Sequence, residues 1–180
     1  MMRELIRNER GALIAELAAI LPVLTVLLLA GVEVSRYALL NQKLDRVATT
    51  VGDLAAQAKS LSVGELDSLL AASRHVAKPF DLQSQGVVIV TSIGAPSGTP
   101  EVNWQRAGAG SHVATSAIGT PGGNASLPEG MLVRQGETVI VAEVFYAFEP
   151  FMFAVAAPEE ELYHRAFFRP RVGSLSTLSP

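Results

Sequence analysis

The strongest hydrophobic pattern in the chain is an apolar run near its N-terminus. Residues 17–32 carry no charge, and extension back to Ala12 gives 21 residues interrupted by one charge, Glu16. About 20 apolar residues cross the hydrocarbon core of a bilayer as a helix. A buried core helix is disfavoured, because the run is apolar on all sides and longer than such a helix usually is. A secretory signal peptide is disfavoured as well, because the run exceeds the apolar part of a usual signal. We therefore expect residues 12–32 to form a transmembrane helix.

Basic residues flank this run on both sides. The leader, residues 1–11, contains three arginines, and three further basic residues, between positions 36 and 46, partly offset this bias. Because arginine and lysine are enriched on the cytoplasmic side of a span, we expect the N-terminus inside and residues 33–180 outside the cytoplasm.

Beyond the run, the apolar positions follow a helical period. Their spacing alternates between three and four residues in the series Tyr37, Leu40, Leu44, Val47, Val51, Leu54, Ala58 and Leu61. This predicts one helix over about 12–61, roughly 75 Å long at 1.5 Å per residue. Its amphipathic part would pack against the following sheet or, alternatively, against a partner subunit in a coiled coil. Ser62 and Glu65 form a capping-box pattern before a second helix over 63–77, so residues 33–78 are predicted to be amphipathic helices.

Residues 79–180 have the period and composition of a small β domain. Four segments alternate or are rich in β-branched and aromatic residues: 86–93, 102–106, 137–148 and 162–169. A stretch rich in glycine, serine, threonine and proline, 108–130, is expected to be a flexible loop. The predicted fold class is α+β: a long N-terminal transmembrane helix continuing into an amphipathic helix, then a short helix and a small antiparallel sheet.

Eight of the eleven aromatic residues lie between positions 145 and 168. They would form the core between sheet and helix, or a patch that meets another subunit or the membrane surface. Phe151, Met152 and Phe153 are the best candidates for exposure and interaction. Inside the last-but-one predicted strand, Glu143 is a charge that we expect to pair with Arg165 or Arg169 across the sheet.

The remaining composition excludes several functions. The 14 basic and 17 acidic residues give a net charge of −3, without the basic surplus that nucleic-acid binding requires. The chain has no cysteine, and its three histidines lack the spacing of a metal site. No nucleophile elbow, dinucleotide fingerprint or phosphate-binding loop occurs. We expect no catalytic residues, no cofactor or metal, and no small-molecule substrate, and hence no enzyme.

Glu16 is the charge that the apolar run must accommodate. A carboxylate is costly within a membrane, but near a helix start the dipole favours it, so Glu16 could be merely an interfacial residue. The residues around Glu16 suggest a functional role in addition. A basic leader, Gly11, and Glu16 five residues into the chain that would begin at Ala12 resemble a type IV prepilin. Over residues 7–45 the sequence is similar to the TadE/TadG-like proteins of the tight-adherence (Tad/Flp) pilus, through Arg10-Gly11, Glu16, Leu21-Pro22 and the Glu33…Arg36 pair. Ala15 and Leu17 depart from the residues common in that family, but both are apolar.

This resemblance implies a set of partners. A prepilin peptidase of the bacterial inner membrane would cut between Gly11 and Ala12, and Glu16 would then pair with the new N-terminal ammonium of a neighbouring pilus subunit. The chain would be a minor pilin or pseudopilin, anchored in the inner membrane with its C-terminal domain in the periplasm, that helps to assemble an adhesive pilus with other pilins and assembly proteins. The alternatives are an uncleaved, single-pass periplasmic binding or scaffold module, and, disfavoured by the missing catalytic motifs, a membrane-anchored hydrolase.

Overall fold

The computed structural model describes residues 9–151 and 160–180, which fall into two compact units. One unit holds the described residues up to Ala38 together with Pro150 and Phe151. The other holds Leu39–Glu149 and the described residues from Glu160 onward. One helix, α2 (Glu9–Gln57), contributes residues to both units.

Helix α2 is continuous through two residues that usually weaken helices. Pro22 lies inside it, within the apolar run where such residues are tolerated, and Gly52 lies near its end. The helix stops four residues earlier than the period predicted, because the amide of Ala58 turns back to the carbonyl oxygen of Ala55 at 3.3 Å. The long helix predicted from the sequence is thus present, with its C-terminal boundary at Gln57.

The second helix, α3 (Val63–Ala77), begins where its capping box predicts. The Ser62 side chain accepts a hydrogen bond from the Glu65 amide, and the Glu65 carboxylate accepts one from the Ser62 amide at 2.9 Å. Each group thereby satisfies an otherwise unpaired donor at the helix start. A single-turn helix that the sequence analysis missed, α4 (Leu82–Gln85), follows and is capped by Asp81.

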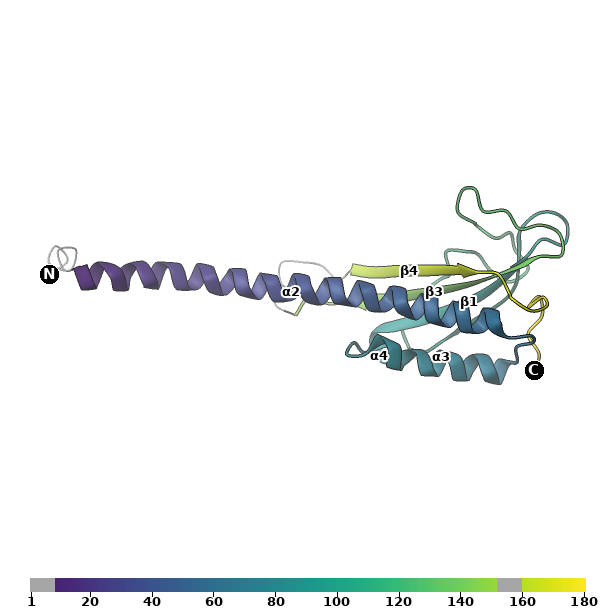
Figure 1. Cartoon of the computed structure of the whole chain (residues 1–180), viewed down its shortest axis with the longest axis horizontal. Helices are drawn as coiled ribbons and strands as arrows, with labels where there is room; N and C mark the ends of the chain where they lie inside the picture. Colours follow the sequence, from purple (N-terminus) through teal and green to yellow (C-terminus); the bar gives the residue numbers. More distant parts are fainter. Residues whose placement is uncertain (1–8, 152–159) are drawn as a thin grey trace. The chain divides into compact units, whose positions relative to one another are not determined.

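The four strands form one antiparallel sheet in the order β2-β1-β3-β4, which confirms the α+β class (Figure 1). The strands are β1 (Gly86–Gly94), β2 (Glu101–Gly108), β3 (Thr138–Phe148) and β4 (Glu160–Phe168). Strands β1 and β3 are central and almost entirely buried, as their β-branched sequences require. The register places Ile89 opposite Glu143, and Glu143 opposite Arg165.

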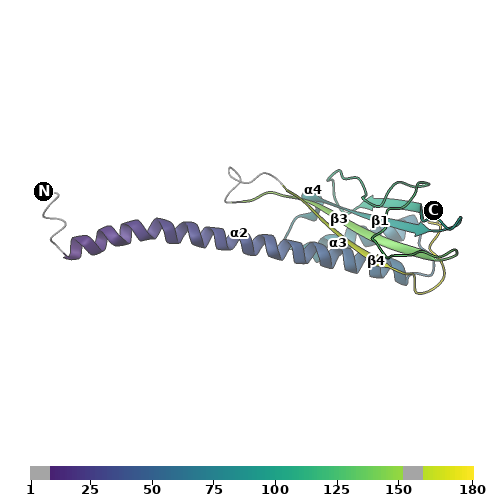
Figure 2. The same cartoon turned by 90° about the horizontal axis from the view of Figure 1, so that it is seen from above.

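Helices cover one face of this sheet (Figures 1 and 2). In α2, Leu40, Leu44 and Val47 are completely buried. At Gly52 a Cβ atom would lie only 2.7 Å from the Phe168 ring, so glycine allows the helix to approach β4 closely. These contacts confirm the expectation that the amphipathic part of the helix packs against its own sheet.

The opposite face is covered by the segment between β2 and β3. Ile118 is fully buried there and Val133 nearly so, in a cluster with Ile93, Val139 and Val141. Residues 111–120 contain no helix or strand, as the composition predicted. One residue of this loop nevertheless belongs to the core, because the Ile118 side chain closes the apolar face of the sheet.

Candidate functional site

The sequence-predicted site residues Gly11, Ala12 and Glu16 all lie in the first turns of α2. Every residue from Ala12 to Leu28 is exposed, and Glu16 has no hydrogen-bond or ion-pair partner among the residues that the structure describes. The helix places Glu16 one turn beyond Ala12, so the two positions share a face about 6 Å apart along the axis. Glu16 is therefore available to a partner outside the described chain.

The exposed apolar surface of α2 needs an apolar environment. Ten large apolar side chains between Leu13 and Leu28 are 44–69% exposed. Since full burial of such a side chain stabilises by about 1.5–3 kcal/mol, half of that for each amounts to about 7–15 kcal/mol. Within the described residues α2 is the one helix long and apolar enough to cross a membrane. The polar Thr25 does not prevent this, because its hydroxyl donates to the Leu21 carbonyl oxygen at 2.8 Å.

A polar cluster marks the point where the apolar run ends. Glu33 accepts a hydrogen bond from the guanidinium of Arg36 at 3.4 Å, which confirms proximity of this i,i+3 pair. The same Oε1 atom accepts the backbone amide of Phe151 at 3.2 Å, across 118 positions of sequence. Phe151 is 77% exposed, whereas Met152 and Phe153, the other two residues of the predicted interaction patch, lie outside the described residues.

The aromatic residues on the strands belong to the core. Phe145, Tyr146 and Phe148 are at most 5% exposed, and the Tyr163 ring packs on Phe145 at 4.8 Å between centroids. The choice left open by the sequence is therefore settled for these residues: they fill the domain, and Phe151 is the exposed member of the described set.

Glu143 lies at the centre of a buried hydrogen-bond network, with no exposure to solvent. Its carboxylate accepts hydrogen bonds from the Ser116 hydroxyl, from the Ala117 amide at 3.0 Å and from the Tyr163 hydroxyl at 2.8 Å. Burial, together with this hydrogen bond, raises the pKa of Tyr163 well above its usual range. The network attaches the loop after β2 to the middle of the sheet.

The expected pairing of Glu143 with Arg165 or Arg169 is wrong. The register does place Arg165 opposite Glu143, but its guanidinium lies over the rings of Tyr163 and Phe167, at 5.8 and 5.4 Å from their centroids. Three donors already satisfy the carboxylate, so the arginine remains at the surface, where it is better hydrated. Arg169 instead contacts the Leu132 carbonyl oxygen and Glu137.

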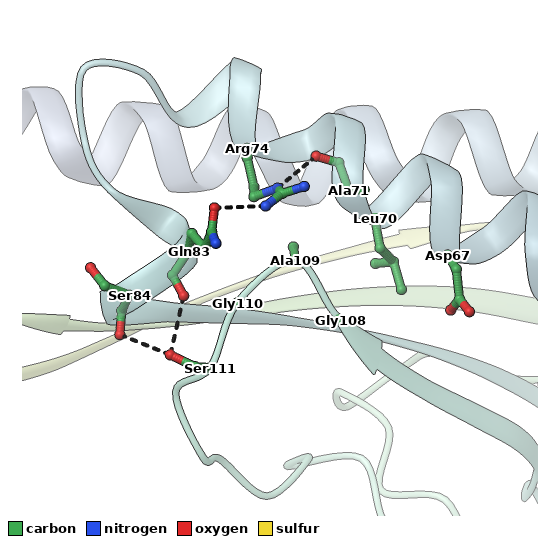
Figure 3. Close-up of a pocket in the computed structure, with 10 residues that line it drawn as sticks. All are labelled: Asp67, Leu70, Ala71, Arg74, Gln83, Ser84, Gly108, Ala109, Gly110 and Ser111. Atoms are coloured by element: carbon green, nitrogen blue, oxygen red, sulfur yellow. Dashed lines mark hydrogen bonds between the residues drawn. The ribbon is translucent and has the colours of Figure 1, made fainter.

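A cavity of about 530 Å³ lies between α3, α4 and the turn after β2 (Figure 3). Its charged groups are held by their neighbours. Arg74 donates to the Ala71 carbonyl oxygen and to Gln83, while Asp67 accepts both arms of the Arg106 guanidinium at 2.7–2.8 Å. The Arg106 hydrogen bond lowers the pKa of Asp67. The cavity thus has mainly structural contacts along its walls and no convergent set of groups that would select a ligand.

The described residues contain no group of three or more histidine, aspartate or glutamate side chains placed to hold a metal ion. Two histidines have structural partners: His112 contacts Glu161 at 2.8 Å, and His164 contacts Asn41 at 3.0 Å. Burial lowers the pKa of His164, although nearby Asp45 opposes the shift.

Comparison with known proteins singles out the same helix. Residues 11–53 match the family model of TadE-like protein. This match confirms the resemblance to TadE/TadG-like proteins of the Tad pilus system, and it suggests a pilus-associated protein. It covers α2 almost to its C-terminal end and stops before α3 and the sheet. No curated protein and no solved structure gives a match to the chain.

Proposed function

We propose that this chain is a minor-pilin or pseudopilin-like subunit of a Tad/Flp adhesive pilus. The observation that carries the proposal is the TadE-like helix itself, whose apolar surface is exposed and contains one charge, Glu16. Residues 12–32 span the inner membrane once, the arginine-containing leader stays in the cytoplasm, and residues 33–180 lie in the periplasm. The protein has a structural role and not a catalytic one, and it acts through helix packing and through its folded C-terminal domain.

Processing would create the partner that Glu16 lacks among the described residues. A prepilin peptidase hydrolyses the bond between Gly11 and Ala12, which leaves a carboxylate on Gly11 of the released leader and an ammonium group on Ala12. A carboxylate in a low-dielectric environment needs such a cation and additional hydrogen bonds. When mature helices pack side by side, the ammonium of one subunit meets Glu16 of its neighbour, and this contact fixes their axial register as one polar residue does in a coiled coil.

The test is Glu16→Gln, made in the chromosomal gene of the native bacterium. The substitution keeps the size of the side chain and the apolar run, so membrane insertion and processing should persist while pilus assembly falls strongly. Pili sheared from the cells and the membrane fraction are probed for the protein and for the other pilins. The matched control is Asp45→Asn, at an exposed position of the same helix beyond the apolar run.

Two results would overturn the proposal. Normal assembly with Glu16→Gln would reduce Glu16 to an interfacial charge and favour an uncleaved scaffold module. Equal losses in both variants would attribute the defect to the helix in general and not to a paired carboxylate.

A further inference from the structure

Phe151 is held against α2 by its backbone while its side chain remains exposed. Its amide donates to Oε1 of Glu33 at 3.2 Å, and 77% of the residue is accessible. Phe151 and the helix up to Ala38 belong to the same compact unit. The contact therefore fixes the level of an exposed phenyl ring along the helix.

That level coincides with the edge of the apolar run. Glu33 directly follows Val32, the last residue of the 21-residue stretch that begins at Ala12. At 1.5 Å per residue this stretch is about 31 Å long, which equals the roughly 30 Å hydrocarbon thickness of a bilayer. The amide of Phe151 consequently lies at the level where hydrocarbon gives way to the polar headgroups.

The burial pattern of α2 changes at this level. From Ala12 to Leu28 the helix is exposed on all sides, but Leu29 and Ala30 are partly covered. Glu33 is partly covered as well and lies three or four residues further along, on the same helix face. The covered face thus begins one turn inside the apolar run.

We propose that Phe151 inserts its ring into the interfacial layer of the bilayer, on the side where residues 33–180 lie, and forms a second membrane contact beside the span. This inference rests on the membrane anchoring in the proposed function. Aromatic side chains are stable at this depth, because the ring leaves water without having to place a charge in hydrocarbon. The sequence of residues 151–157 carries no charge, whereas Glu149 and residues 159–161 on either side are acidic. The attraction is therefore apolar, and a zwitterionic membrane suffices.

The absence of cysteine allows a clean test on the full chain. Single cysteines carrying the fluorophore NBD are placed at Phe151, at Leu24 in the middle of the span, and at Leu132 in the loop between β2 and β3. Leu132 is the matched control, because it is 75% exposed, nearly the same as Phe151. Each protein is reconstituted into phosphatidylcholine vesicles that contain a nitroxide either on the headgroup or deep in the acyl chain.

The label at Phe151 should emit at shorter wavelength than the label at Leu132 and be quenched most by the headgroup nitroxide. The label at Leu24 should be quenched most by the deep nitroxide. Glu33→Ala removes the acceptor of the Phe151 amide and should reduce quenching at Phe151, whereas Glu33→Gln retains a carbonyl oxygen and should preserve it.

Several results would overturn the inference. A Phe151 label that resembles the Leu132 label, whether both are in water or both are quenched, would show no specific insertion. A blue-shifted Phe151 label that neither nitroxide quenches would show that a protein, such as a second copy, covers the ring. If the Leu24 label escaped both quenchers, membrane anchoring itself would fail, and with it the proposed function; a quenched Leu24 beside an unquenched Phe151 would remove this inference alone.

Discussion

The buried carboxylate of Glu143 provides a sharp test of how the domain is held together. Replacement by alanine removes one acceptor group from three donors: the hydroxyls of Ser116 and Tyr163, and the amide of Ala117. Two of these donors lie on the loop between β2 and β3, 26–27 positions away in the sequence. Loss of their hydrogen bonds should therefore detach this loop from the sheet that it covers. We expect Glu143→Ala to destabilise the folded domain.

The size of the effect follows from the burial of each donor. Ser116 is only 9% exposed, and a buried donor left without an acceptor costs about 1–3 kcal/mol. Ala117 and Tyr163 are near enough to the surface to reach water, so each should cost about 0.5–1.5 kcal/mol, the net value of an ordinary hydrogen bond. Removal of a buried carboxylate also recovers part of its desolvation cost. The expected loss is therefore about 2–4 kcal/mol, out of a total of about 5–15 kcal/mol for a typical domain.

The assay is urea unfolding of the full chain in detergent micelles, followed by tryptophan fluorescence. Trp104 is the one tryptophan of the chain, is 8% exposed and donates its indole hydrogen to the Leu175 carbonyl oxygen at 2.8 Å, so it reports loss of tertiary structure. Tyr163→Phe removes one donor and should cost about 0.5–1.5 kcal/mol. Arg165→Gln should cost only about 0.5–1 kcal/mol, because that side chain does not contact Glu143 and loses just its exposed contacts with the rings of Tyr163 and Phe167.

Either of two results would contradict this role of Glu143. If Glu143→Ala cost no more than Tyr163→Phe, the network would not hold the loop. If Arg165→Gln cost as much as Glu143→Ala, a cross-strand ion pair would be the stabilising contact after all.

Two further predictions concern the same domain. Gly110→Ala should lower stability by about 1–3 kcal/mol in the same unfolding assay, because its Cβ would overlap the backbone carbonyl oxygens of Gly86 and Leu82. Gly64→Ala is the matched control: its Cβ would have nothing within 4 Å, so this variant should be neutral or stabilising. A destabilised Gly64→Ala, or an unaffected Gly110→Ala, would contradict the packing described. Burial lowers the pKa of His164, so below about pH 6.5 the unfolded chain binds a proton at this imidazole more readily than the folded chain, and stability should fall as the pH drops. His164→Gln should make stability less dependent on pH between about 7 and 5. An unchanged pH profile in this variant would contradict the burial effect at His164.

Periodic patterns made most of the fold predictable. The three-and-four spacing from Tyr37 onward, the capping box at Ser62 and the β-branched strands each depend on neighbours within a few positions. Helix α4 was missed because a single turn capped by Asp81 has no apolar period to detect. The burial of Ile118 was missed as well, since one apolar residue among glycine, serine and threonine gives no pattern.

Contacts between distant segments were not predictable from the sequence. The Glu143 carboxylate is satisfied by Ser116 and Ala117, and the facing arginine, which charge complementarity favoured, stacks on rings instead. The contact between Glu33 and the Phe151 amide joins positions 118 apart. By contrast, the residues proposed for processing and assembly, Gly11, Ala12 and Glu16, could be named from the sequence, because the motif that carries the family resemblance is local to one helix.

Whether α2 is the helix of a processed pilus subunit can be read from the N-terminus of the mature protein. The protein is purified from its native membrane, and its intact mass is measured together with its N-terminal sequence. We expect a mature chain that begins at Ala12, with Glu16 as its fifth residue. A chain from the same membranes that still begins at Met1 or Met2 would contradict processing and would leave an uncleaved, membrane-anchored scaffold.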